Sequence, residues 1–254
     1  MASHLILVSS FRVGLCLNEG GLSQTTEESS LDGVTLALMH GIWDEPSDYA
    51  SSGAAFPDEW RSQFRDIILG EEAALLGDGA GCEMRRKLLD HVSYRSAALL
   101  SSLGEATWTK QTLNVSALIP MRIVGDGTWT SELGDGVSCL TIGEVARRLL
   151  ASEGDNAPPT SHLGRLRNLR KSIGQWPSTL VVVSDGQHYT LLDGNHRAVV
   201  LVADALELEN QANCKEGALD EPVGRVFVGE GPPGDPKPWK FWRKCALEAP
   251  LSPA

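Results

Sequence analysis

The segment from Thr179 to Ala203 limits the possible folds more than any other part of the chain. It contains an apolar run at 180–183, a polar turn at 184–187, apolar residues at 191–192, the turn Asp193-Gly194-Asn195 and an apolar stretch at 198–203. Short apolar runs bounded by turn residues are typical of strands, and a glycine before a longer apolar stretch indicates a tight turn into a helix. We therefore predict strand, hairpin turn, strand, glycine turn and buried helix, in that order.

The residues at the predicted junction of strand and helix can bind an anion. The first backbone N–H groups of a helix have no partner within the helix and lie at the positive end of its dipole. Gly194 lets an anion approach the backbone, while Asn195, His196 and Arg197 add side-chain donors. The pattern predicts a phosphate site. The alternative is an ordinary Asp-Gly turn followed by a surface His-Arg pair.

The string Asp193-Gly194-Asn195-His196-Arg197, between a strand and a small-apolar helix, resembles the signature box of the ParB/sulfiredoxin superfamily. Members bind nucleotide phosphates with this box, and the nearest variant is the Asp-Gly-His-His-Arg box of the free-serine kinases. Sulfiredoxin needs a cysteine where this chain has Asn195, and the ParB branch typically has Gly-Glu-Arg-Arg. The resemblance covers residues 115–230 and implies an α+β fold with a small mixed sheet and flanking helices. The helical spacing of 58–69 and 83–103 adds a mostly helical N-terminal region, which resembles no known family.

A second segment, 161–173, is predicted to be an amphipathic helix with Ser161 as its N-cap. Arg165, Asn168 and Ser172 share one flank of this helix. Sulfiredoxin places a lysine, a serine and a threonine toward ATP at the same spacing. The resemblance therefore implies that this flank contacts a nucleotide, whereas the alternative is a solvated basic face.

The resemblance implies a nucleotide-dependent phosphotransferase acting on a small polar metabolite. Catalysis would rest on Asp193, His196 and Arg197, with Asp193 binding Mg²⁺ or accepting the proton of the substrate hydroxyl. The family's kinases also use a glutamate from the loop after the first strand. Asp126, Glu132 and Asp135 are the candidates here, and the sequence does not decide between ATP and CTP.

The same residues are compatible with four other functions. The chain could be a non-catalytic regulatory module that binds CTP or ATP, a ParB-like DNA-binding protein, or a ParB-like nuclease. It could also use ATP to activate a carboxylate through a phosphoryl intermediate. The formal net charge of −11 argues against nucleic acid and anionic membrane surfaces as partners.

The chain divides into three predicted parts: an N-terminal region at 1–112, a ParB/sulfiredoxin-like domain at 113–230 and a C-terminal extension at 231–254. Within the domain, 125–159 is an insertion long enough to act as a lid or substrate loop. We predict helices at 58–69, 83–103 and 141–151, strands at 4–17, 117–124 and 222–228, a short helix or strand at 33–42, and loops at 18–32 and 77–81, with 204–219 a loop or frayed helix.

Cysteine usage and apolar runs favour a cytoplasmic protein. The five cysteines are far apart and form no Cys-x-x-Cys pair, so zinc-ribbon and thioredoxin-like sites are not supported. Scattered thiols are typical of a reducing compartment. No signal peptide is recognisable, and no apolar run approaches the roughly 20 residues of a membrane span.

Overall fold

The computed structural model describes residues 26–44, 56–92, 100–101, 103, 106–123, 129, 132–133, 140–152, 157–158, 161–171, 179–184, 188–210 and 217–230. Its strands are β1 (Thr26–Ser29), β2 (Thr107–Asn114), β3 (Arg122–Ile123), β4 (Leu180–Ser184), β5 (Tyr189–Asp193) and β6 (Pro222–Glu230). The helices are α1 (Leu31–Asp44), α2 (Asp58–Ile68), α3 (Glu72–Gly77), α4 (Gly79–Val92), α6 (Val115–Leu118), α8 (Ile142–Ala151), α9 (His162–Arg170), α10 (Asn195–Asn210) and the 3₁₀ turn η3 (Ala218–Asp220).

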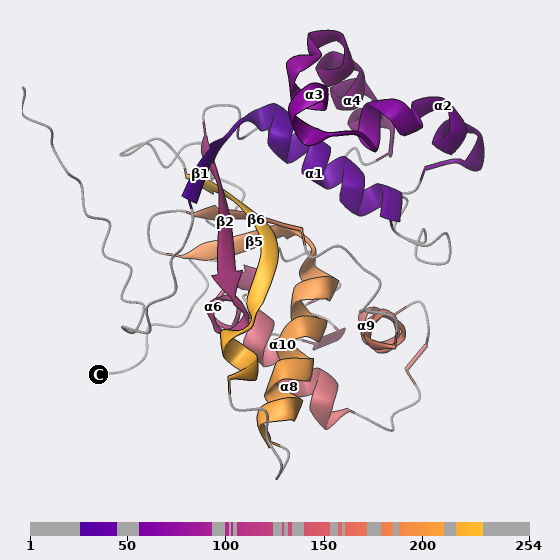
Figure 1. Cartoon of the computed structure of the whole chain (residues 1–254). Helices are drawn as coiled ribbons and strands as arrows, with labels where there is room; N and C mark the ends of the chain where they lie inside the picture. Colours follow the sequence, from indigo (N-terminus) through magenta and orange to yellow (C-terminus); the bar gives the residue numbers. More distant parts are fainter. Residues whose placement is uncertain are drawn as a thin grey trace, which may run out of the picture.

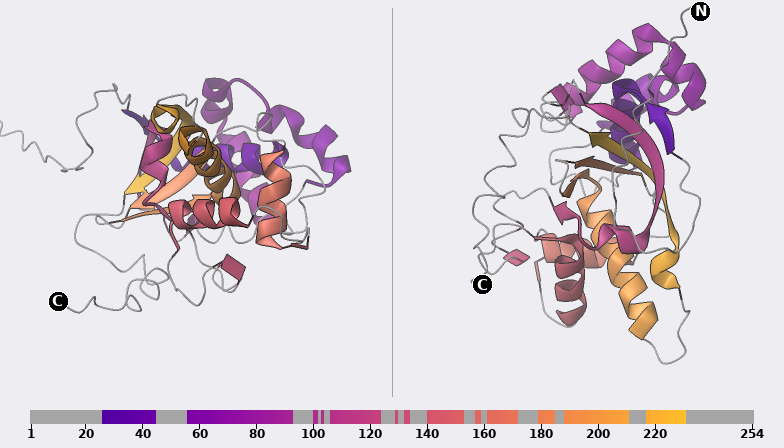
Figure 2. Two further views of the ribbon diagram at one scale, coloured as in Figure 1. Left: turned by 90° about the horizontal axis from the view of Figure 1, so that it is seen from below. Right: turned by 90° about the vertical axis from the view of Figure 1, so that its left-hand side faces the viewer.

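The described strands form one mixed sheet in the order β1-β2-β6-β4-β5-β3. The β4–β6 and β3–β5 pairs are parallel and the other neighbours are antiparallel. Helices cover both faces of this sheet: α1–α4 lie on one side and α8–α10 on the other (Figures 1 and 2). The predicted α+β class with a mixed sheet and flanking helices is therefore confirmed.

Strand β4 separates two apolar cores. Leu180 and Val182 pack with the core formed by α8, α9 and α10, whereas Val181 and Val183 pack with the core formed by α1, α2 and α4. Successive side chains of a strand point to opposite faces, so a strand covered on both faces has no polar alternation. This explains why the run at 180–183 is continuously apolar.

The order of elements predicted for 179–203 is confirmed. β4 and β5 pair as an antiparallel hairpin, and α10 begins directly after Gly194. α10 continues to Asn210, so the prediction of a loop or frayed helix from Asp204 was wrong for 204–210. The acidic end of α10 is held in place because Arg170 of α9 bonds to Asp204 at 2.6 Å and also to Glu207.

Three other local predictions were wrong, at least in part. Residues 26–29, expected within a loop, form edge strand β1, because backbone pairing with β2 does not require apolar side chains. Gly79 and Gly81, also expected in a loop, lie in the first turn of α4, where Asp78 accepts from the Ala80 N–H at 3.2 Å. Of the described residues in the predicted strand 117–124, Arg122–Ile123 form strand, at the sheet edge, and α6 occupies 115–118.

The other helix predictions agree with the structure within the described residues. Segment 33–42 belongs to α1, residues 58–68 form α2, and residues 83–92 of the segment 83–103 belong to α4. The segment at 141–151 is α8, which Thr141 and Glu144 begin with a capping box. Ser161 caps α9 as predicted, accepting from the Gly164 N–H at 3.0 Å, and 222–228 lies within β6.

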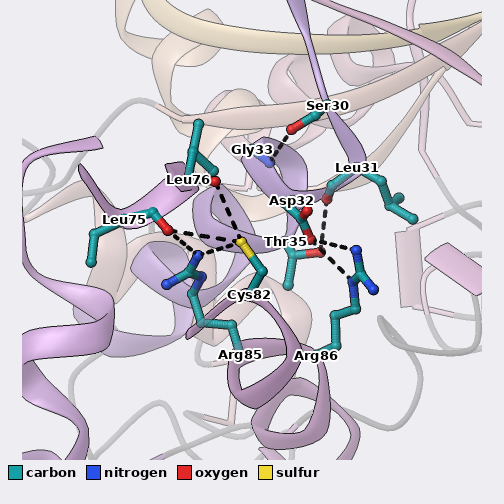
Figure 3. Close-up of polar contacts among 10 residues, drawn as sticks. All are labelled: Ser30, Leu31, Asp32, Gly33, Thr35, Leu75, Leu76, Cys82, Arg85 and Arg86. Atoms are coloured by element: carbon teal, nitrogen blue, oxygen red, sulfur yellow. Dashed lines mark hydrogen bonds and ion pairs between the residues drawn. The ribbon is translucent and has the colours of Figure 1, made fainter. Parts of the chain in front are cut away.

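A fully buried guanidinium, that of Arg85, joins the N-terminal helices (Figure 3). It donates to the carbonyls of Ile67 and Leu75, at 3.0 and 2.6 Å, and to the sulfur of Cys82 at 2.9 Å. The two carbonyls belong to the last turns of α2 and α3, where helix carbonyls lack partners and attract a cation. Arg85 thus connects α4 to α2 and α3.

The N-terminal helices and the sheet are also joined by ion pairs. Glu72 of α3 binds Lys110 of β2 at 3.1 Å and Arg225 of β6 at 2.8 Å. The predicted boundary between residues 112 and 113 falls inside β2, and β1 belongs to the same sheet as the later strands.

Several predictions concern residues that the structure does not describe. They are the strands at 4–17 and the extension 231–254, together with parts of the insertion and of the segments at 18–32 and 83–103. Among the helices that the structure describes, none has both the length and the apolar character required to cross a bilayer.

Candidate functional site

The turn between β5 and α10 has the backbone geometry that the sequence predicts. Gly194 has φ +86°, a left-handed conformation that other residues adopt at a cost. A Cβ at this position would lie 2.4 Å from Cδ2 of the buried Leu180. The Ala198 N–H donates to the Gly194 carbonyl at 2.8 Å, which closes the first turn of α10. Glycine is therefore required here both by its backbone angle and by the space available.

Asp193 and Arg197, which the sequence places in separate roles, bind each other. Nη2 of Arg197 lies 2.8 Å from Oδ2 of Asp193, and their side chains are 10% and 34% exposed. Helix α1 approaches this pair, since a Cβ on Gly41 would lie 3.2 Å from the guanidinium and 3.3 Å from the carboxylate. The guanidinium is thus bound to Asp193 and covered on one side by α1. To bind a phosphate, Arg197 would have to give up or share its contact with Asp193.

His196 meets a histidine that the sequence analysis did not select. Nδ1 of His162, the first residue of α9, lies 3.1 Å from Nε2 of His196 in the first turn of α10. Trp129 stacks on the His162 ring at 4.1 Å between centroids and lies at 4.7 Å from the His196 ring. Two helix N-termini and one indole ring therefore meet at a pair of imidazoles.

The insertion also brings a carboxylate to this position. Glu132 accepts a hydrogen bond of 2.6 Å from the backbone N–H of His162, at the N-terminus of α9. Glu132 itself is exposed, whereas Trp129 and His162 are buried. Of the three candidate bases, Glu132 is the one whose position is known, because Asp126 and Asp135 lie outside the described residues.

The predicted nucleotide-binding flank of α9 is described in part. Arg165 is half-buried and Asn168 is exposed, while Ser172 lies outside the described residues. Among the described residues, α9 contacts the box through His162 and His196. In the box itself, Asn195 has a buried Oδ1 for which the described residues offer no hydrogen-bond partner. This oxygen can accept a hydrogen bond from a ligand hydroxyl or amine.

Two site residues were missed by sequence reasoning, namely His162 and Trp129. His162 follows the N-cap Ser161, so a position at a helix N-terminus could have drawn attention to it. Trp129 lies in a glycine-rich stretch with no periodic pattern, and no local signal identifies it. Within the described residues, no group of three or more histidine, cysteine or acidic side chains lies in a position to hold a metal ion.

Comparison of the chain with protein-family models, curated proteins and solved structures finds no significant match. The resemblance to the ParB/sulfiredoxin superfamily therefore rests on the box Asp193–Arg197 and on the elements around it.

Proposed function

We propose that the chain is a nucleotide-dependent phosphotransferase that moves the γ-phosphoryl group of ATP to a hydroxyl of a small polar metabolite. The observation that carries this proposal is the position of Glu132. This carboxylate lies after β3 and bonds to the residue that begins α9, whose ring contacts His196. The resemblance to the free-serine kinases implies a glutamate from the loop after the first strand, and Glu132 is the candidate in that loop whose position supports the proposal.

Phosphate binding is assigned to the start of α10. The N–H groups there point along the helix axis toward the turn, and a helix N-terminus of this kind favours an anion. His196 adds a donor from one side. The guanidinium of Arg197 is 3.4 Å from the position of a Cβ on Gly194. A polyphosphate at the turn would compete with Asp193 for this guanidinium.

The proposed chemical step is an in-line transfer to the substrate hydroxyl. Glu132 accepts the proton of the substrate hydroxyl, and the oxygen bonds to the γ-phosphorus as the bond between that phosphorus and the β–γ bridging oxygen breaks. ADP leaves with the electron pair. Positioning and charge neutralisation supply most of the catalysis in such transfers.

Magnesium is part of the proposal through Asp193. Mg²⁺ bound to ATP commonly uses one or two protein carboxylates, so the lack of a larger acidic group among the described residues is compatible with it. When bound, the ion neutralises charge on the β- and γ-phosphate oxygens. Asp193 would offer the oxygen that is not bonded to Arg197.

The test is ADP release from ATP and Mg²⁺ with a panel of hydroxyl-bearing amino acids, sugars and polyols. Glu132→Gln should lower the rate with the active metabolite about 10²- to 10⁴-fold, because it removes a general base and keeps a similar shape. Asp193→Asn should lower it at least as much. Asp32→Asn is the matched control, since Asp32 forms an Asp–Arg pair of 2.7 Å with Arg86 away from the box.

Two results would contradict the proposal. One is ADP release that no metabolite stimulates above the background of the control. The other is stimulated release that survives unchanged in both Glu132→Gln and Asp193→Asn. Thermal unfolding with ATP and with CTP identifies the preferred nucleotide, because a ligand that binds the native state raises its apparent stability.

The contact of α1 with the ion pair favours a second candidate, a regulatory module without turnover. Gly41 lies against both Asp193 and Arg197, so a phosphate that separates the pair would also change the packing of α1. In that case a nucleotide should bind and alter hydrogen exchange across α1, with no ADP release in the presence of any metabolite.

A further inference from the structure

The bond between His162 and His196 restricts where protons can lie. Nδ1 of His162 and Nε2 of His196 are 3.1 Å apart. While this hydrogen bond exists, one of the two nitrogens carries the shared proton and the other accepts. A neutral imidazole has one donor and one acceptor nitrogen, and an imidazolium has two donors. The bonded pair can therefore hold one positive charge and not two. If His196 is the cation, His162 must be neutral with its proton on Nε2.

The groups around the pair act in opposite directions on a charge at His196. The positive end of the α10 dipole and the guanidinium of Arg197 disfavour it. Glu132 from the insertion and Asp193 from β5 favour it, and the Trp129 ring at 4.7 Å stabilises a cation beside its face. On α9 the nearest charged side chain in sequence is Arg165. On α1, His40 bonds to the Ile68 carbonyl at 2.5 Å and is thereby engaged elsewhere.

We propose that His162 is a positioning residue that accepts a hydrogen bond from a protonated His196 and so keeps a cation at the start of α10. The proposal rests on the proposed function for the identity of the ligand, a nucleoside triphosphate. The acceptor is held rigidly, because His162 is 8% exposed, stacks on Trp129 and has its backbone N–H bound to Glu132. Loss of this acceptor should make the proton leave His196 at a lower pH.

Two substitutions separate the hydrogen bond from the ring packing. His162→Phe keeps an aromatic ring against Trp129 and removes the acceptor. His162→Asn removes the ring and restores an acceptor oxygen near the position of Nδ1. The readout is the NMR titration of the histidine ring signals in the full chain without nucleotide, in which the His196 signal is identified by its absence from His196→Gln.

The titration midpoint of His196 should fall by about one pH unit in His162→Phe, which corresponds to one hydrogen bond to a charged group. In His162→Asn it should return toward the wild-type value. An unchanged midpoint in the phenylalanine variant overturns the inference, and so does an equal fall in both variants, which would assign the effect to ring packing.

Binding of a non-hydrolysable ATP analogue then separates this inference from the proposed function. If both hold, the affinity in His162→Phe should fall about fivefold at the wild-type midpoint and should differ less at lower pH, where His196 is protonated in either protein. A shifted midpoint with no binding of the analogue in the wild type supports the role of His162 and refutes the nucleotide site. An unshifted midpoint overturns the role of His162 whether or not the analogue binds.

Discussion

Replacement of Gly194 by alanine tests the geometry on which the candidate site depends. Gly194 joins β5 to α10 with φ +86°, and an added Cβ would lie 2.4 Å from Cδ2 of Leu180. Leu180 has no exposed surface and belongs to the core packed by α8–α10, so it has little room to move. The substitution therefore combines an unfavourable backbone angle with overpacking.

The expected cost follows from these two contributions. The left-handed conformation costs an L-residue about 1–2 kcal/mol, and overpacking a filled core costs about 1–3 kcal/mol. Alanine also restricts the unfolded chain, and this effect offsets about 0.4–1 kcal/mol of the loss in stability. The free energy of unfolding of Gly194→Ala should therefore be lower than that of the wild type by about 2–4 kcal/mol.

Urea unfolding of Gly194→Ala and Gly217→Ala, followed by circular dichroism, separates the two contributions. Gly217 has φ +91°, and the nearest atom to its added Cβ lies at 3.9 Å, so its substitution carries the backbone cost without a clash. We expect Gly217→Ala to cost about 1 kcal/mol. In Gly194→Ala/Leu180→Val, where Cδ2 is absent, part of the Gly194 cost should disappear as a coupling energy. Equal losses in Gly194→Ala and Gly217→Ala would refute the close contact with Leu180.

Two further predictions concern residues outside the box. Arg85→Met should lower the free energy of unfolding by about 2–5 kcal/mol, since it leaves the carbonyls of Ile67 and Leu75 without their donor. A smaller loss in urea unfolding would contradict a linking role for Arg85. Burial and the charge of Glu230 raise the pKa of Tyr189 above its ordinary value of 10.0. The folded state therefore keeps a proton that the unfolded state releases, and stability should fall as pH rises from about 10 through the folded pKa. Ultraviolet titration should show one late phenol that disappears in Tyr189→Phe, and a titration unchanged by this substitution would be inconsistent with the assignment.

Local sequence was sufficient for the central part of the fold. The apolar run of β4, the turn glycine and the small-apolar helix α10 were predictable because each depends on neighbours within a few residues. The N-cap of α9 at Ser161 was predictable for the same reason. The capping box of α8, formed by Thr141 and Glu144, is an equally local feature. The prediction of an anion site at the turn of Gly194 rests on these local features alone.

The tertiary structure decided which side chains meet at that turn. Asp193 and Arg197 bind each other beside Gly41 of α1, and His196 contacts His162, which lies 34 residues away in sequence. Strand β1 likewise forms because its backbone pairs with the edge of β2, although the four side chains of β1 are polar. Such contacts depend on how distant segments pack, and neither hydrophobic periodicity nor motif spacing carries that information. The sequence by itself determined the glycine turn between β5 and α10, and the packing of α1, α9 and the insertion determined which side chains surround that turn.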